Sequence, residues 1–243
     1  MLTKWILLFA VSSSAFAYNL TTDFKNGFYW ATLPINITVV DGNETRKNLL
    51  TTIAKKAITE WEQESGLSLW DFTEAGTPNV IRWSDRFEQE TKMDPMSVLA
   101  VAIRYTEGPY FAKTEIVING NHFLNQSVEH LYTTITHELG HTMGLDHSDD
   151  MLAVMAPTLQ DPYNGLQTDD LEGLREVESQ TEHRQTTRYV SPLAYEKEAK
   201  ASPLSCGTVG PAGASSANTF LSLGAGLLIG FVRKLFRWLK SLR

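Results

Sequence analysis

The chain has 243 residues and only one cysteine, Cys206, so it cannot form an internal disulfide. It is also short of positive charge: 21 Lys and Arg stand against 28 Asp and Glu. Residues 1–17 and the segment after Cys206 hold six of the basic residues and none of the acidic ones, which leaves the middle at −13. A domain this acidic is a poor candidate for binding nucleic acid or anionic lipid.

Long apolar runs are scarce as well. Near the N-terminus, residues 5–11 are apolar, Lys4 precedes them, and small residues follow as far as Ala17. That layout is typical of a secretory signal peptide, with cleavage before Tyr18. The alternative is a membrane anchor, but the run is shorter than the roughly 20 residues that span a bilayer. We therefore expect the protein to be exported.

A second apolar run, residues 220–232, lies near the C-terminus and is followed by a basic end. It is short for a full span, but no charge occurs between Cys206 and Arg233, and long basic side chains can reach the membrane surface. Basic residues after such a run predict a cytoplasmic end, with the rest of the protein outside. Two interpretations stay open. One is a plain tail anchor, and the other is a cleaved sorting tail attached through Cys206, because the segment resembles bacterial C-terminal sorting tails of the Myxo type.

Apolar spacing between these ends predicts an ordered series of elements. Alternation at residues 35–39 favours a strand, and residues 43–64 carry apolar side chains at helical spacing. Further strands are expected at residues 67–72, 79–83, 98–105 and 114–119. A second helix begins near Ser127, with Leu131, Ile135 and Leu139 as its core stripe. This order predicts an α+β fold of α/β type with a mixed sheet.

The most informative segment reads His-Glu-Leu-Gly-His-Thr-Met-Gly-Leu-Asp-His and begins at His137. His137 and His141 are four residues apart, so on a helix they share one face and can reach the same metal ion. Gly144 permits the left-handed conformation that ends many helices, and the chain can then bring in His147 as a third ligand. Three imidazoles predict one catalytic Zn²⁺ with a fourth position open for water.

Glu138 lies between the paired histidines and can act as the base for a water held by that zinc. A bare His-Glu-x-x-His match is often a coincidence, with solvated or hydrogen-bonded histidines. The added glycine and third histidine make chance agreement improbable, because five fixed positions must then coincide.

The same residues resemble a known family. Residues 137–147 match the zinc signature of the metzincin metalloendopeptidases, and Ser148 resembles the matrixin branch, the relatives of matrix metalloproteinases. Residues 153–157, Ala-Val-Met-Ala-Pro, resemble the Met-turn of that branch. Weaker matches are residues 166–173 to the family's last helix and residues 99–102 to its substrate-facing edge strand. The resemblance extends over about residues 28–177.

That resemblance implies a metzincin-like zinc protease domain with an active-site helix, a Met-turn and a C-terminal helix. It implies that His137, His141 and His147 bind the zinc and that Glu138 is catalytic. It also implies that Met155 forms a hydrophobic floor below the metal without binding it.

Two features of the animal enzymes are missing. A cysteine-bearing propeptide is absent, because Cys206 is the only cysteine and lies after the matched region. The histidine- and aspartate-rich segment that binds a second zinc and calcium is absent between Ala102 and Glu115. We therefore expect one zinc, no calcium site, some other means of latency, and a bacterial type of enzyme.

Taken along the chain, residues 1–17 are expected to be the signal peptide and residues 18–180 the zinc metallopeptidase domain. Residues 181–218, where periodicity fades, are expected to be a flexible linker, and residues 219–243 the anchor or sorting tail. The predicted function is hydrolysis of extracytoplasmic polypeptides, with the enzyme membrane-anchored, surface-sorted or extracellular. The alternative is a catalytically silent, membrane-anchored binding or adhesion module on the same fold, which the intact Glu138 disfavours. No feature specifies an oligomeric state.

Overall fold

A computed structural model describes residues 17–207, except residues 75, 124–126 and 196–200. The leader up to residue 16 and the tail at 219–243 lie outside the described residues. Within the described part of the chain, no helix is both long enough and apolar enough to cross a membrane.

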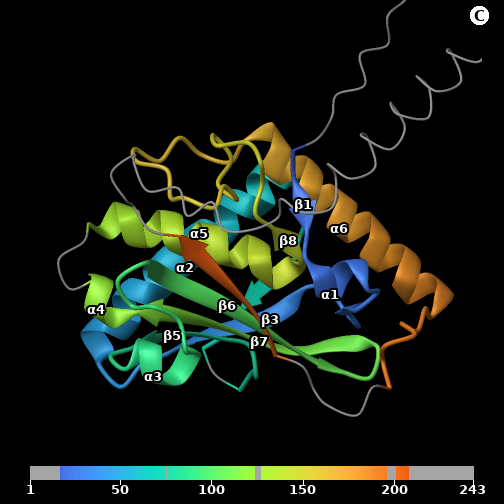
Figure 1. Cartoon of the computed structure of the whole chain (residues 1–243), viewed down its shortest axis with the longest axis horizontal. Coiled ribbons are helices and arrows are strands. Elements are labelled where there is room, and N and C mark those ends of the chain that lie inside the picture. Colours follow the sequence, from blue (N-terminus) through green and yellow to red (C-terminus); the bar gives the residue numbers. More distant parts are fainter. Residues whose placement is uncertain (1–16, 75, 124–126, 196–200, 208–243) are drawn as a thin grey trace, which may run out of the picture. The chain divides into compact units, whose positions relative to one another are not determined.

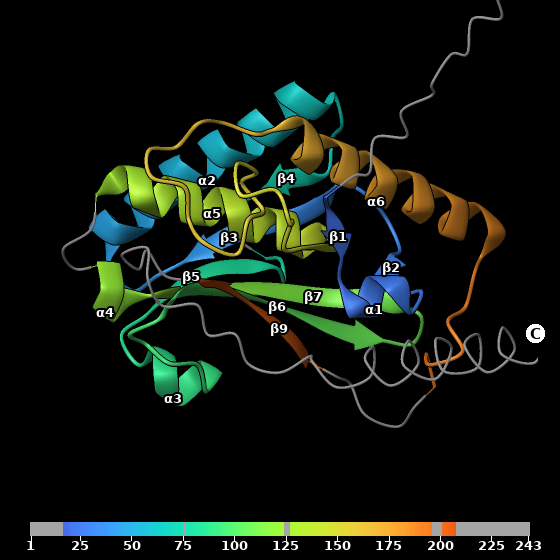
Figure 2. The same cartoon turned by 45° about the horizontal axis from the view of Figure 1, so that its top comes forward.

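The centre of the domain is a seven-stranded mixed sheet (Figures 1 and 2). Its strands run in the order β4-β3-β5-β7-β6-β9, and β2 pairs with one end of β7. The first four strands of that order are parallel to one another, whereas β6 is antiparallel to both β7 and β9. Their bounds are β2 Tyr29–Trp30, β3 Ile35–Val40, β4 Trp70–Phe72, β5 Val80–Ser84, β6 Val98–Glu107, β7 Tyr110–Asn119 and β9 Ala201–Gly207. The mixed sheet predicted from the sequence is confirmed.

Three long helices lie on one side of this sheet, as Figure 2 shows: α2 (Glu44–Ser65), α5 (Val128–Met143) and α6 (Thr168–Thr187). Short elements complete the domain. They are β1 Asn19–Leu20, which pairs with β8 Leu145–Asp146, and the helices α1 Thr22–Lys25, α3 Phe87–Thr91 and α4 Gly120–Phe123. The α/β-type fold expected from the order of elements is therefore present.

Helix α2 has a cap at each end and the buried apolar stripe that its sequence pattern predicts. Asn43 caps its first turn by accepting a hydrogen bond from the Arg46 amide, and Gly66 ends it with a φ of 75°. Its apolar stripe, which includes Leu50 and Trp61, is completely buried in the core between the helices and the sheet. Burying one face in this way supplies most of the stability of an amphipathic helix.

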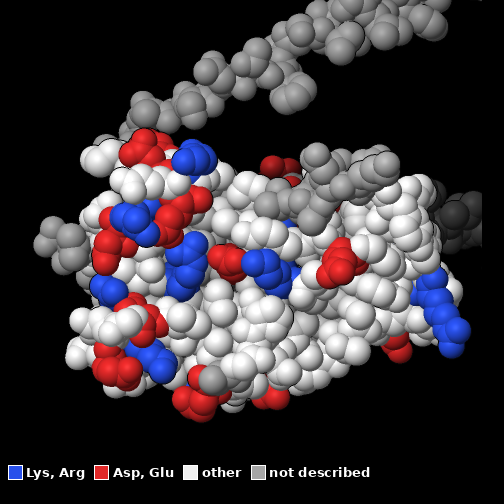
Figure 3. Space-filling view, turned by 90° about the horizontal axis from the view of Figure 1, so that it is seen from below, with Lys and Arg blue, Asp and Glu red and all other residues white. Residues whose placement is uncertain are grey.

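The opposite side of the sheet carries charge of both signs. Seen from below, acidic and basic side chains intermix over one end of this face (Figure 3). Ion pairs join β5, β7 and α3 there: Arg82 pairs with Glu90 at 2.6 Å and with Glu115 at 3.4 Å, and Lys113 pairs with Glu115 at 2.9 Å. Among the described residues at this end of the face, charges of both signs are therefore paired and form no patch of one sign.

Two stretches differ from the expected linker at residues 181–218. Helix α6 continues to Thr187, because Arg184 donates to the Phe28 carbonyl and the Tyr29 hydroxyl donates to the Arg184 carbonyl. Strand β9 lies inside the same region and pairs with β6. Polar anchors and main-chain hydrogen bonds hold these two stretches, and neither leaves a hydrophobic period in the sequence.

Candidate metal centre

Helix α5 brings the first two signature histidines into the core. Its first turn is capped by the Ser127 side chain, which accepts from the His130 amide, as the sequence predicted. The helix ends at Gly144, whose φ is 120°. A side chain at that position would also collide with Phe24, since a Cβ there would lie 2.8 Å from the ring. Gly144 thus turns the chain sharply toward β8 and His147.

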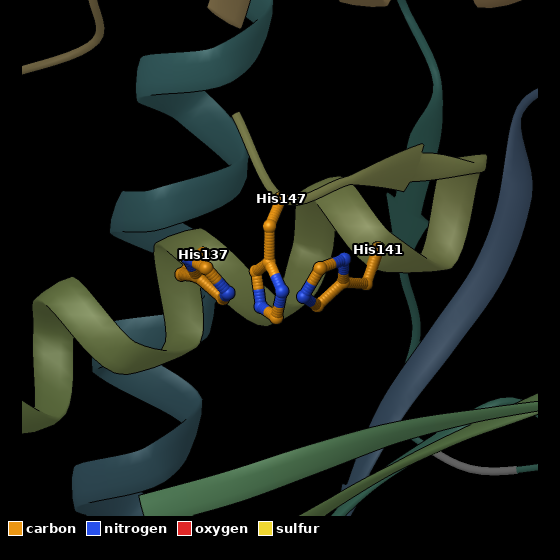
Figure 4. A group of neighbouring side chains, drawn as sticks. All are labelled: His137, His141 and His147. Carbon is orange, nitrogen blue, oxygen red and sulfur yellow. The ribbon is translucent and has the colours of Figure 1, made fainter. Parts of the chain in front are cut away.

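The three histidines converge, as Figure 4 shows. His137 and His141 extend from α5, and His147 reaches the same point from the segment just after β8. One ring nitrogen of each lies within 4.8 Å of the others. His137 and His141 are completely buried, and His147 is half-buried. All three predicted ligands are therefore brought together in one group.

Backbone carbonyls fix the orientation of the two buried rings. His137 Nδ1 lies 2.6 Å from the Val154 carbonyl oxygen, and His141 Nδ1 lies 2.8 Å from that of Leu145. A carbonyl only accepts hydrogen bonds, so each Nδ1 carries the proton and each Nε2 keeps its lone pair. Both Nε2 atoms are buried and have no hydrogen-bond partner among the described residues. A buried acceptor left unpaired costs about 1–3 kcal/mol, and a zinc ion at the meeting point would remove that cost.

Burial also keeps these imidazoles neutral. The pKa of His137 is lowered to about 3: burial is the main cause, the neighbouring His147 also lowers it, and the hydrogen bond to the Val154 carbonyl opposes both. Burial likewise holds the pKa of His141 well below its ordinary value, with His137 and His147 adding to the effect. Neutral imidazole is the form that binds a metal, so the site is ready for zinc at neutral pH. The donor set and its protonation both fit that ion.

Glu138, the predicted base, is completely buried in α5 beside His137. Glutamate is almost never fully buried without a specific role or partner. The helix thus presents a carboxylate and two imidazoles from the same two turns, which is the combination that metal-assisted hydrolysis needs.

Met155 lies under the helix. It is buried and packs against Gly140, where a Cβ would overlap the Met155 sulfur. Gly140 therefore lets the methionine approach α5 closely. The sequence pattern gave no separate reason to choose Gly140, because its requirement comes from a side chain fifteen residues away.

The Asp169 and Asp170 carboxylates connect α6 to the segments around the site. Asp170 accepts from the amides of Val154 and Met155, each at 2.9 Å, and burial raises its pKa to about 6 against the effect of these bonds. Asp169 accepts from the Ser148 hydroxyl at 2.6 Å and from the amides of Ala17 and Tyr18 at 2.8 Å. The turn that holds Met155 is thereby fastened to the last helix.

A buried ion pair holds the C-terminal end of α5. Arg104 of β6 is completely buried, pairs with Asp23 at 2.7 Å, and donates to the His141 carbonyl. Trp30 donates to the Thr142 carbonyl at 2.9 Å from the neighbouring β2. These donors satisfy carbonyls of the last helical turn, which have no partner within the helix. Sequence reasoning missed this clamp, although an arginine in an otherwise apolar strand was a usable signal.

Comparison with known proteins agrees with this geometry. The family model for matrixins, peptidase family M10, matches residues 30–178. Matrix metalloproteinase-16 of Rattus norvegicus, Homo sapiens and Mus musculus is 41% identical to this chain over 63 residues, or 24% of the chain. The matched part spans only a tenth of the length of those relatives. With the family model covering more than half of the sequence, the chain belongs to the matrixin family of zinc metallopeptidases.

Proposed function

We propose that this protein is a zinc-dependent endopeptidase whose metal ligands are His137, His141 and His147 and whose general base is Glu138. The observation that carries the proposal is the arrangement of the buried Nε2 atoms of His137 and His141. A hydrogen bond from Nδ1 to a backbone carbonyl fixes each ring, so that both Nε2 lone pairs are directed to one point. Membership of the matrixin family supports peptide hydrolysis over the alternative of a silent binding module.

Zinc, when bound, supplies a Lewis acid that polarises the peptide carbonyl and makes water a better nucleophile at neutral pH. Glu138 takes the proton of the attacking water and then delivers it to the leaving amine. The carbonyls of Val154 and Leu145 keep the two buried rings in position throughout, so the histidines need not reorganise. The clamp from Arg104 keeps the end of α5 from shifting.

The setting of the reaction is a proposal from the sequence pattern. The leader at residues 1–17 directs export, and the substrates are polypeptides outside the cytoplasm. The apolar run and basic end at residues 219–243 attach the enzyme to a membrane or serve as a sorting tail, and a bacterial source accords with both. The sequence supports the tail assignment, because residues 207–232 carry no charged side chain and every charged residue from Arg233 to Arg243 is basic.

The test compares the wild-type protein with Glu138→Gln. The wild type should bind about one zinc per chain and cleave an unstructured polypeptide, whereas Glu138→Gln should keep its zinc and lose about 10²–10⁴-fold in kcat/KM. Glu129→Gln is the matched control, because Glu129 lies on the same helix and is exposed. Zinc content and initial rates are measured on all three proteins. Full activity in Glu138→Gln would refute the assigned role.

A further inference from the structure

Strand β9 occupies the outer edge of β6. Its partners run from Tyr105 opposite Ala201 to Val101 opposite Ser205, after which the register shifts. Strand β9 is also a neighbour of α5, the helix that carries the site. Figure 1 shows β9 as a red-brown arrow directed toward α5. The edge of the sheet nearest the histidines is thus taken up by the chain's own later segment.

Hydrogen bonds of the neighbouring strand β7 show which backbone amides of β6 face β9. Thr114 of β7 donates its amide to Asn79, on the side of β7 away from β6. Its partner Arg104 is therefore in a pair without ladder hydrogen bonds to β7, and the Arg104 amide faces outward to β9. By alternation, the Ala102 amide faces outward as well.

The position of Pro203 in β9 independently indicates the same orientation of the backbone amides. Proline has no amide to donate, so in an edge strand it sits where the amide would face away from the neighbouring strand. Pro203 is opposite Ile103, and the amides directed at β6 are then those of Ser202 and Leu204. These two residues are the partners of Arg104 and Ala102. Both arguments assign the same hydrogen-bonded pairs.

A free sheet edge binds an extended polypeptide through main-chain hydrogen bonds, with little regard to sequence. Strand β6 is joined to the site, since Arg104 donates to the carbonyl of His141. A peptide added to this edge would therefore run past α5, where Glu138 and the histidines lie. The groups that would hold it are the ones that β9 already uses.

We propose that β9 is an autoinhibitory segment: it occupies the edge of β6 that an extended polypeptide substrate needs, and it has to leave before the substrate binds. The proposal rests on the proposed function and concerns the regulation of that same site. Strand β9 follows α6 in the same chain, so its pairing with β6 is intramolecular and has an advantage over a free peptide. Weak strand pairing is then enough to keep the site closed.

The first experiment uses a pair of proline substitutions in the full-length protein. Leu204→Pro removes an amide directed at β6, whereas Ser205→Pro removes one directed away from it. Leu204→Pro should raise kcat/KM for an unstructured polypeptide at least about fivefold, the factor that one hydrogen bond is worth. Ser205→Pro should stay within about twofold of the wild type.

The second readout needs no activity. Amide hydrogen exchange is measured on the chelator-treated proteins at Ala102 and Arg104, which face β9. Both amides should exchange faster in Leu204→Pro and keep the wild-type rate in Ser205→Pro. The amides of Val101 and Ile103, which face β7, should be unchanged in either variant.

The third readout adds the strand back as a peptide. A peptide of residues 201–207 with serine at position 206 should raise the KM of Leu204→Pro without lowering kcat. The serine removes the thiol, so metal chelation cannot account for inhibition. Equal rates in all three proteins, or a peptide that does not compete, would overturn the proposal. The expected exchange pattern in a protein that cuts nothing would instead refute the protease assignment and leave β9 as a bound strand.

Discussion

Two backbone carbonyls decide which nitrogen of each buried histidine is available. Because Val154 and Leu145 hold Nδ1 of His137 and His141, the lone pairs of Nε2 are directed inward before any metal arrives. The sequence could predict which residues gather, since helical spacing and a glycine turn follow from the order of residues. It could not predict the two carbonyls, which come from the turn and strand after α5.

Acid should destabilise the metal-free protein through His137. The pKa of His137 is about 3 in the folded protein and near 6.5 in an unfolded chain, so only the unfolded chain takes up a proton between these values. The contribution of neutral His137 to the free energy of unfolding is therefore complete above pH 6.5. It is lost as the pH falls toward 3, by up to about 1.4 kcal/mol per pH unit.

The measurement is urea unfolding in chelator at several pH values from 7.5 to 5, for the wild type and for His137→Gln. The unfolding free energy of the variant should fall less steeply as the pH is lowered, because its unfolding takes up about one proton fewer. Asp170, whose raised pKa acts in the opposite direction, is present in both proteins and cancels in the difference. Parallel pH profiles would count against the buried neutral histidine.

Gly140→Ala should destabilise the protein even though alanine favours helices by about 1 kcal/mol over glycine. The added Cβ overlaps the Met155 sulfur in a buried site, and overpacking costs about 1–3 kcal/mol. In a Met155→Ala background the same change should lose most of its cost. Urea unfolding of the four proteins measures this, and an equal cost in both backgrounds would exclude the contact as the cause.

At the scale of elements, the clamp on α5 combines distant parts of the chain. Asp23 lies in α1, Arg104 in β6 and His141 in α5, so one ion pair fixes the site helix against the sheet and the N-terminal segment. Helices α2 and α5 were predictable because their apolar stripes repeat at helical spacing. Strand β9 was not predictable, because a polar, proline-containing strand carries no such period. Arg104 stands out in an apolar strand, but the sequence does not show that its partners are Asp23 and the His141 carbonyl.

Asp23→Asn should cost about 3–5 kcal/mol of unfolding free energy, because it leaves the Arg104 guanidinium buried without its counter-ion. The control is Glu74→Gln, which removes the mostly exposed pair of Glu74 with Lys55 and should change stability by less than about 1 kcal/mol. Both are measured by chemical unfolding at neutral pH. Similar losses in the two variants would mean that burial of the pair is not decisive.

The whole chain brings Cys206 into the domain, because it lies in β9 and β9 pairs with β6. The sequence set it beyond the matched region and outside any latency mechanism, but the strand that contains it is paired with the domain sheet. Strand pairing joins residues about 100 positions apart, which no local pattern reveals. The expected alternative means of latency therefore has a structural candidate in β9.

The intact mass of the protein isolated from its native membrane shows whether its N-terminal leader and C-terminal tail have been processed. We expect cleavage before Tyr18 to remove the leader. A chain that continues to Arg243 would support a plain anchor, and a modified end near Cys206 would support sorting. A mature chain that still begins at Met1 would contradict export through a cleaved signal peptide.

The Nε2 lone pairs of the two buried histidines should make the stability of this protein depend on the zinc concentration around it. Folding gathers three imidazoles that the unfolded chain keeps apart, so a zinc ion held by them would favour the folded form and shift the folding equilibrium by mass action. Free zinc at about 1,000 times the dissociation constant adds about 4.1 kcal/mol to the stability. Because a single cysteine cannot form an internal disulfide, we expect the lifetime of this protein to depend partly on the zinc content of its surroundings.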